Sequence, residues 1–328
     1  MSLTIGMTYD LRDDYRALGY SEEETAEFDK VDTIEGIENG IAAMGHRPVR
    51  IGNITTLVNK LAIGEKWDLV FNIAEGFHGV SREAQVPALL EAYRIPYTHS
   101  DPVVLGYTHQ KAMTKRIVHS CGLNTAEFFV VESAADIARC NLAFPLFAKP
   151  LAEGTGKGIS DQSLVTDKAG LESVCCQILS TFHQPVLVEE YLPGREFTVG
   201  VVGTGEESTA IGVMEVVFND GKNGIYSYNT KANYEELVSY RLVNDELGKA
   251  CATLAVASHR ALGCRDVSRI DIRQDASGKP SFIEVNALPG LNPPHSDLPI
   301  MCRMANIDYN TLIKRIVESA LKRYPNIE

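Results

Sequence analysis

Two runs near the end of the chain, RIDIRQ at 269–274 and SFIEVN at 281–286, alternate apolar and polar residues with a period of two. This alternation is typical of strands, and DASGK between them has the composition of a turn. A two-residue loop at Ser277 and Gly278 predicts a tight hairpin. One face of the hairpin is the predicted core, formed by Ile270, Ile272, Ile283 and Val285.

The other face of the hairpin carries four polar side chains. In the predicted register Asp271 opposes Glu284, and Arg269 lies opposite Asn286, with opposed Cβ atoms about 5 Å apart. Two carboxylates this close repel each other unless a cation lies between them or one is protonated. Carboxylates and an amide oxygen are hard ligands that suit Mg²⁺ held with phosphates, and a neighbouring arginine can bind a phosphoryl group. The hairpin alone leaves two interpretations open, a metal site and a solvated face with a salt bridge.

The chain has 328 residues, more than one ordinary core holds, so two or three domains are expected. Apolar strands alternate with helices over residues 1–100, which predicts an open parallel α/β domain. Residues 101–190 have the pattern of a compact α+β unit, and 191–328 that of a mostly antiparallel sheet with helices. The predicted fold class is therefore α/β combined with α+β, in three domains.

Charge and cysteine usage restrict the partners. The formal net charge of −12 argues against a nucleic-acid groove, which needs clustered Lys and Arg. Seven scattered cysteines without a Cys-x-x-Cys pair favour reduced thiols over a disulfide framework or a zinc site. We find no signal peptide, and the apolar runs are too short for a membrane span. We therefore expect a cytoplasmic protein with small-molecule substrates and no nucleic-acid or membrane partner.

A glycine-rich loop with Gly154, Gly156 and Gly158 follows Lys149, which lies at a predicted strand end. Glycines allow backbone N–H groups to wrap around phosphate oxygens. The loop matches neither the Walker pattern nor GxGxxG, and a flexible surface loop would look the same. Lys111 at the start of the QKAMTKR helix is likewise either a phosphate ligand or a solvated side chain.

A Pro-Gly turn separates two predicted strands in VLVEEYLPGREFTVGVV, residues 186–202. Backbone groups of such a hinge can hold a flat heterocycle, while a carboxylate accepts hydrogen bonds from ribose hydroxyls. The candidate carboxylates are Glu189, Glu190 and Glu196. An acidic hinge between domains is the alternative interpretation.

These features occur in an order that resembles the ATP-grasp superfamily and, within it, the D-alanine–D-alanine ligases. The resemblance extends over nearly the whole chain, with AEGFHGVSREAQVPALLEAYRIPYTHSD at the position of the family's His-Gly segment. It is strongest over VLVEEYLPGREFTV and RIDIRQDASGKPSFIEVNALPG. The resemblance implies a three-domain ATP-grasp architecture, and it favours the metal site over the solvated face.

The resemblance also implies a role for each matching position. The implied ATP ligands are Lys111, Lys149, Gly154, Gly156, Glu189, Glu190, Tyr191, Leu192, Glu196 and Lys231. The implied ligands of one or two Mg²⁺ (or Mn²⁺) ions are Asp271, Glu284 and Asn286. The implied catalytic groups are Arg269, the backbone N–H of Gly290, Lys231 and Thr155. The implied substrate contacts are Glu27 for the amino group of the first substrate and Ser296 for the carboxylate of the second, and Glu75, at the position of the family's histidine, is a further predicted substrate contact.

The implied reaction joins two amino acids. A carboxylate attacks the γ-phosphate of ATP to give an acyl phosphate, and an amine then displaces phosphate through a tetrahedral oxyanion. No protein nucleophile is required, which agrees with the lack of a convincing Ser-His-Asp or Cys-His arrangement. Catalysis would rest on positioning and charge neutralisation. A homodimer is a further expectation from the family.

Four departures from the family pattern cluster at the first-substrate pocket: Glu75 in place of the usual histidine, Thr155 in place of a serine, Ala232 in place of a tyrosine, and an extra residue with two prolines in LNPPHSDLP. From Glu75 and the space at Ala232 we hypothesise a larger or more cationic first substrate than D-alanine. Three readings stay open: D-alanyl-D-alanine formation, ligation of another amino acid or hydroxy acid pair, and a nucleotide-binding protein without turnover. A dinucleotide oxidoreductase is disfavoured because LTIGMTYD lacks the glycine fingerprint.

Overall fold

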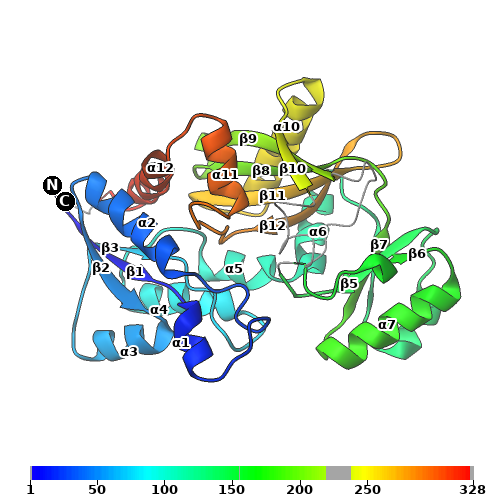
Figure 1. Ribbon diagram of the computed structural model, residues 1–328, viewed down its shortest axis with the longest axis horizontal. Coiled ribbons are helices and arrows are strands. Elements are labelled where there is room, and N and C mark those ends of the chain that lie inside the picture. Colours follow the sequence, from blue (N-terminus) through cyan, green and yellow to red (C-terminus); the bar gives the residue numbers. More distant parts are fainter. Residues whose placement is uncertain (1, 155, 219–237, 326–328) are drawn as a thin grey trace.

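The computed structural model describes residues 2–154, 156–218 and 238–325, and its strands form three separate sheets (Figure 1). The first is a three-stranded parallel sheet in the order β2-β1-β3. Its strands are β1 (Thr4–Thr8), β2 (Arg47–Gly52) and β3 (Leu69–Asn72). The helices of this region are α1 (Arg12–Ala17), α2 (Val31–Ala43), α3 (Ile54–Ala62) and α4 (Gln85–Ala92), with a 3₁₀ turn at η1 (Arg82–Ala84). The predicted parallel α/β character of the N-terminal part is confirmed.

Helix α2 shows how the sequence pattern produces this packing. Its Ile34, Ile37 and Ile41 recur at helical spacing and are all buried in the core that also contains strand β1. The last helix, α12 (Tyr309–Lys322), packs against α2 in the same core. Figure 1 shows the two helices side by side, so the end of the chain completes the N-terminal core.

The second sheet has four antiparallel strands in the order β4-β7-β5-β6. They are β4 (Phe128–Val131), β5 (Leu146–Pro150), β6 (Leu164–Val165) and β7 (Val186–Glu190). Helix α7 (Lys168–Phe182) packs on this sheet through a buried stripe that includes Leu171, Val174 and Ile178. The short helices of this part are η2 (Ala134–Arg139) and η3 (Asp161–Ser163).

The third sheet has five antiparallel strands in the order β10-β9-β8-β11-β12. They are β8 (Glu196–Val202), β9 (Thr209–Phe218), β10 (Val238–Leu242), β11 (Val267–Gln274) and β12 (Pro280–Asn286), with η4 (Gly205–Glu207) between β8 and β9. Helix α10 (Glu246–Ala261) packs on one face, and α11 (Asp297–Met304) contacts β8 and β9.

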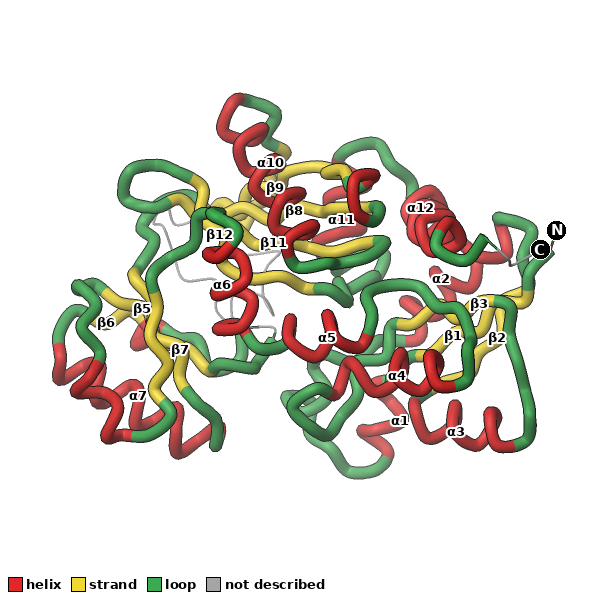
Figure 2. Tube along the Cα trace, turned by 180° about the vertical axis from the view of Figure 1, so that it is seen from behind, coloured by secondary structure: helices red, strands yellow, loops and turns green. Residues whose placement is uncertain are grey.

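Two earlier helices, α5 (Pro102–Thr108) and α6 (Lys111–Ser120), share a hydrophobic core with this third sheet. Figure 2 shows α6 beside β12, in agreement with the contacts between them. The predicted domain boundaries at residues 100 and 190 therefore stay a proposal. Packing joins α12 to the first unit and α5 and α6 to the third.

The hairpin of β11 and β12 has the predicted pairs at its functional end. Arg269 lies opposite Asn286, and Asp271 lies opposite Glu284. The predicted loop is wrong, because Asp275 donates its N–H to the Lys279 carbonyl and thereby closes a three-residue loop. The last loop residue, Gly278, has a φ of 83°, the left-handed conformation that such loops need.

A register shift between Asp271 and Ile272 absorbs the extra loop residue. Beyond this shift Ile272 pairs with Phe282, which is completely buried. Ile283 is only partly buried, so its predicted place in the core is a second error. This register shift is a β-bulge that the sequence did not predict. Its effect on the pairing offsets that of the longer loop, so the polar pairs are the predicted ones.

Candidate active site

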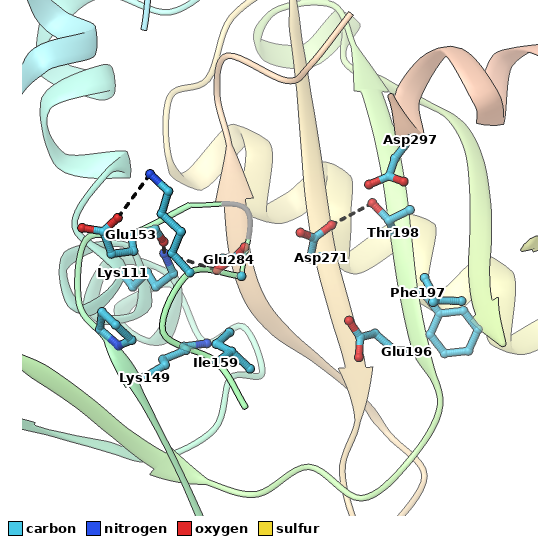
Figure 3. Close-up of a pocket in the computed structure, with 14 residues that line it drawn as sticks. Lys111, Lys149, Glu153, Ile159, Glu196, Phe197, Thr198, Asp271, Glu284 and Asp297 are labelled. Atoms are coloured by element: carbon cyan, nitrogen blue, oxygen red, sulfur yellow. Dashed lines mark hydrogen bonds and ion pairs between the residues drawn. The ribbon is translucent and has the colours of Figure 1, made fainter. Parts of the chain in front are cut away.

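Two neighbouring cavities contain most of the predicted site residues. The smaller lies between the β8, β11 and β12 strands and the glycine loop, and Figure 3 shows Lys111 and Lys149 on one side of it and Asp271 on the other. The larger has a volume of about 690 Å³ and is lined by all three parts of the chain. Lys111 and Glu284 line both cavities, which places the two next to each other.

Asp271 holds Arg269 at the centre of the hairpin face. Nε and Nη2 of Arg269 donate to the two oxygens of Asp271 at 3.0 and 2.9 Å. Thr198 on the neighbouring strand β8 donates to Oδ1 of Asp271 at 2.7 Å. Nη1 of Arg269 lies 3.6 Å from Asp297, which begins α11. Burial disfavours the charged guanidinium, but the two aspartates outweigh it and raise the pKa of Arg269.

Glu284, the second carboxylate of the face, has its own cation. Nζ of Lys111 lies 3.5 Å from Oε2 of Glu284 and donates to the Glu153 carbonyl at 2.5 Å. The first residue of α6 thus connects the hairpin with the glycine loop. Each carboxylate of the hairpin is neutralised by a different basic side chain, so the two can lie across from each other on adjacent strands.

The donor set of this face fits a hard divalent cation. Asp271 and Glu284 offer carboxylate oxygens and Asn286 an amide oxygen, and phosphate oxygens would supply the other ligands that Mg²⁺ requires. Within the described ranges, no group of three or more His, Cys, Asp or Glu side chains is arranged to hold a metal ion by itself. Phosphate oxygens or water would therefore have to complete the coordination of a metal at this face.

A buried ion triad supports the base of the smaller cavity. Nζ of Lys149 lies 2.7 Å from one oxygen of Glu189, and Nζ of Lys115 lies 2.9 Å from the other. Burial raises the pKa of Glu189, but the two lysines outweigh it and lower that pKa to about 2. The sequence analysis missed Lys115, although it lies one helical turn after Lys111 in QKAMTKR.

The predicted adenine-binding segment follows β7. The N–H groups of Glu190 and Tyr191 donate to the carbonyls of Glu127 and Pro145, so these two amides are already used within the sheet region. Nη1 of Arg273 lies 3.1 Å from Glu196, and its guanidinium lies 5.3 Å from the Tyr191 ring centre. Arg273 was not predicted as a site residue, because its link to Glu196 crosses between strands β11 and β8. Leu192 lies in the turn between β7 and β8.

The glycine loop touches the N-terminal part of the chain. A Cβ atom at Gly154 would lie 2.1 Å from Oε1 of Glu27, so a larger residue there would require the Glu27 side chain to move. Gly156 lines the smaller cavity. Thr155, Lys231 and Ala232, which carried three of the sequence-based predictions, lie outside the described residues.

The N-terminal wall of the larger cavity is acidic. Glu27 forms a 2.6 Å ion pair with Arg82, and Glu75 and Glu83 line the same cavity. Glu83 and the neighbouring His109 were missed by the sequence analysis, since nothing in the local pattern places them beside Glu75. The structure thus brings together the two predicted first-substrate residues and adds a third carboxylate.

Gly290 and Ser296 also line the larger cavity. Oγ of Ser296 accepts the N–H of Asn292 at 3.0 Å, and a Cβ atom at Gly290 would lie 2.7 Å from that oxygen. Both residues line the cavity together with Arg269. The predicted oxyanion groups and the predicted contact of the second substrate are therefore neighbours.

Comparison with known proteins gives consistent matches. A family model described as "D-ala D-ala ligase C-terminus" matches residues 117–318. The D-alanine–D-alanine ligase of Bordetella petrii is 33% identical over 270 residues, covering 81% of this chain and 79% of that protein. The corresponding ligase of Aquifex aeolicus is 31% identical over 287 residues, covering 87% and 93%. An uncharacterized protein of Sinorhizobium fredii, y4sG, is 32% identical over 259 residues, covering 78% and 75%.

Solved structures agree on the fold. The D-alanine–D-alanine ligase of Bacillus anthracis, complexed with ATP, superposes with a TM-score of 0.72 at 21% identity, covering 98% of both chains. The VanG D-Ala:D-Ser ligase of Enterococcus faecalis gives a TM-score of 0.73 at 20% identity, covering 98% of this chain and all of that one. At these identities the likeness concerns the fold.

Proposed function

The chain belongs to the D-alanine–D-alanine ligase family of ATP-dependent ligases, and on this premise we propose that it joins the carboxylate of one amino acid to the amine of a second. One observation carries the proposal. The polar face of the hairpin, with Arg269 held by Asp271, opens into a cavity that also contains Gly290 and Ser296. Groups for phosphate, oxyanion and carboxylate recognition thus line one space.

The triphosphate would bind between the lysines and the hairpin. Lys111 and Lys149 line the smaller cavity together with Asp271 and Glu284. When bound with ATP, a Mg²⁺ ion would neutralise phosphate charge, and its protein ligands would be Asp271, Glu284 and Asn286. The glycine loop would cover the phosphates and exclude water from the reactive intermediate.

The reaction has two steps. A carboxylate oxygen of the first substrate forms a bond to the γ-phosphorus, the bond from that phosphorus to the bridging oxygen of ADP breaks, and ADP leaves. The amine of the second substrate then attacks the acyl carbon, inorganic phosphate leaves with the oxygen of the broken C–O bond, and the nitrogen loses a proton. Arg269 and the backbone N–H of Gly290 would stabilise the oxyanion between addition and loss of phosphate.

The second substrate would bind near Ser296, the N-cap residue of α11. Its carboxylate would accept hydrogen bonds there, and Lys231, outside the described residues, would contact the terminal phosphate. Glu189, Glu190, Tyr191 and Leu192 would hold adenine through the chain after β7, and Glu196 would bind the ribose. These assignments rest on the family resemblance.

The proposal includes the location and assembly of the protein. All seven cysteines are free thiols, which agrees with the reducing cytoplasm where ATP is available. Among the described helices, none has the length and apolar character needed to cross a bilayer. A homodimer is part of the proposal, and light scattering at several protein concentrations tests it.

Phosphate release from ATP and Mg²⁺ tests the function directly. Each amino acid is supplied alone and in pairs, and the products are identified by mass spectrometry. We expect release together with a dipeptide mass. ATP binding without release under any combination would instead identify a nucleotide-binding protein, and release with a hydroxy acid would identify an ester-forming ligase.

A further inference from the structure

We propose that the first substrate carries a second positive charge besides its α-ammonium group, and that Glu75 and Glu83 bind the two positive groups. The inference rests on the proposed function, since it concerns the first-substrate end of that same cavity. It commits to one class of ligand, a diamino monocarboxylic acid. Its carboxylate would point toward Arg269 and the hairpin, and its amines toward the N-terminal wall.

Acidic side chains outnumber basic ones at the N-terminal end of the larger cavity, where Glu22, Glu27, Asp29, Glu75 and Glu83 line it together with Arg12 and Lys30. Glu27 is paired with Arg82 at 2.6 Å. No hydrogen bond or ion pair to the side chain of Glu75 or Glu83 is formed by the residues in the described part of the chain. Arg82 acts on both glutamates only at longer range, and Lys111 acts on Glu83, so two carboxylates face the cavity without a direct ion pair. A single α-ammonium would neutralise only one of them.

The pKa shifts of Glu75 and Glu83 agree with this lack of direct ion-pair partners. Burial raises the pKa of Glu75, and the nearby charges of Glu83, Glu27 and Asp29 raise it further against the opposing effect of Arg82. Burial also raises the pKa of Glu83, to about 7. Both carboxyl groups are thus poorly stabilised as anions in the ligand-free protein, and an adjacent cation would reverse this shift.

Two observations that do not involve the carboxylates indicate a ligand at this wall. The cavity is continuous with the predicted reaction centre, because Arg269, Gly290 and Ser296 line it too. In addition, Nδ1 of His109, on the same cavity wall, is buried and has no hydrogen-bond partner among the described residues. A buried ring nitrogen is costly unless a ligand or an ordered water gives it a hydrogen bond. Burial lowers the pKa of His109 to about 4, so the neutral ring can accept a hydrogen bond from an ammonium group.

The position of the wall also favours a substrate over a structural ion. The loop residue Gly154 packs against Glu27, so the wall lies next to the predicted phosphate-covering loop. A first substrate must reach both this loop and the hairpin face. The volume of about 690 Å³ is ample for an amino acid with a charged side chain beside a second amino acid.

Three amino acids test the inference through phosphate release: D-ornithine, its neutral isostere D-norleucine, and D-alanine, each offered as first substrate with a common second amino acid. For the unmodified protein we expect kcat/KM for D-ornithine to exceed that for D-norleucine at least tenfold. In Glu75→Gln and Glu83→Gln this preference should fall to about threefold or less. The matched control Glu23→Gln removes the same charge from an exposed position before the site and should keep the full preference.

Equal use of D-norleucine, or D-alanine as the best first substrate, would overturn the inference and leave the ligase function intact. Retention of the preference in both Gln variants would also overturn it. Failure of every amino acid to release phosphate would contradict the ligase function instead. In that case calorimetric titration of D-ornithine and D-norleucine, with Mg²⁺ and a non-hydrolysable ATP analogue, decides the charge preference without turnover. Tighter binding of D-ornithine supports the inference, and equal binding rejects it.

Discussion

Two pairs of carboxyl groups border the same cavity, one on the hairpin and one on the N-terminal wall. Asp271 and Glu284 lie opposite each other across two strands, and each has a basic partner in the protein. Glu75 and Glu83 have no such partner among the described residues. The first pair is stabilised before any ligand binds, whereas the second becomes stable as a charged pair only when a cation arrives. Similar side chains thus serve two purposes, and the surrounding cations decide which.

The largest effect is expected when the cation of the first pair is removed. In Arg269→Ala, kcat should fall by about 100- to 1000-fold, because the lost side chain acts on negative charge that develops late in the reaction. The affinity for ATP should change little. Steady-state kinetics and calorimetry measure the two quantities.

The matched control for this change is Arg241→Ala. Arg241 lies on β10 in the same sheet, is largely exposed and pairs with Glu215. Its loss should leave turnover nearly unchanged. An equal loss of ATP affinity and turnover in Arg269→Ala would contradict the role assigned to Arg269.

A second change removes charge compensation from the nucleotide end. In Lys115→Met, Glu189 keeps Lys149 but loses its other cation inside the protein. Breaking a buried pair in this way should lower the free energy of unfolding by about 3 kcal/mol, measured by urea denaturation. A stability equal to that of the unmodified protein would mean that Lys149 alone neutralises Glu189.

The pH dependence of substrate binding distinguishes the two pairs. Burial raises the pKa of Glu83 to about 7. The negative charge of Glu27 also raises this pKa, whereas the positive charges of Arg82 and Lys111 lower it. Glu75 lies nearby. The carboxyl group of Glu83 is therefore mainly neutral below this pH and charged above it, while the side-chain amine of D-ornithine, which resembles that of lysine, stays protonated up to about pH 8. KM for D-ornithine should fall about tenfold between pH 6 and 8. A flat profile in Glu83→Gln is the expected control.

The smallest effect concerns stability without ligands. Glu83→Gln removes a charge that has no described counter-ion, so the free energy of unfolding at pH 8 should rise, by about 1 kcal/mol. Thermal melting of the ligand-free protein measures this. A lower melting temperature would show that a cation of the protein already compensates Glu83 and would remove the contrast between the two pairs.

Local sequence patterns predicted the hairpin end of the site well. The alternation of residues 269–274 and 281–286 fixes which side chains share a face, and the pairs Arg269–Asn286 and Asp271–Glu284 are present. The loop length was wrong, since an alternating pattern does not reveal a bulge. The core position given to Ile283 belongs to Phe282 for the same reason.

Local sequence patterns could not predict the contacts between segments that are distant in the chain. Lys115 reaches Glu189 from another element, and Glu83 lies beside Glu75 only because a 3₁₀ turn follows the loop after β3. The charge balance of a cavity depends on such contacts. The sequence therefore predicted the acidic residue Glu75, but it did not predict that Glu75 has no ion-pair partner among the described residues. The fold itself was predictable, since the order of strands and helices and the family resemblance agree.

The bulge in β11–β12 has a consequence for engineering. The register changes between Asp271 and Ile272, so the turn beyond it can change length by one residue without moving the pairs above it. A chain with a two-residue turn and without the extra residue of β12 would keep the same polar face. The tip of this ribbon is therefore a place where peptide tags or reporter groups can be inserted while the chemistry of the cavity is preserved.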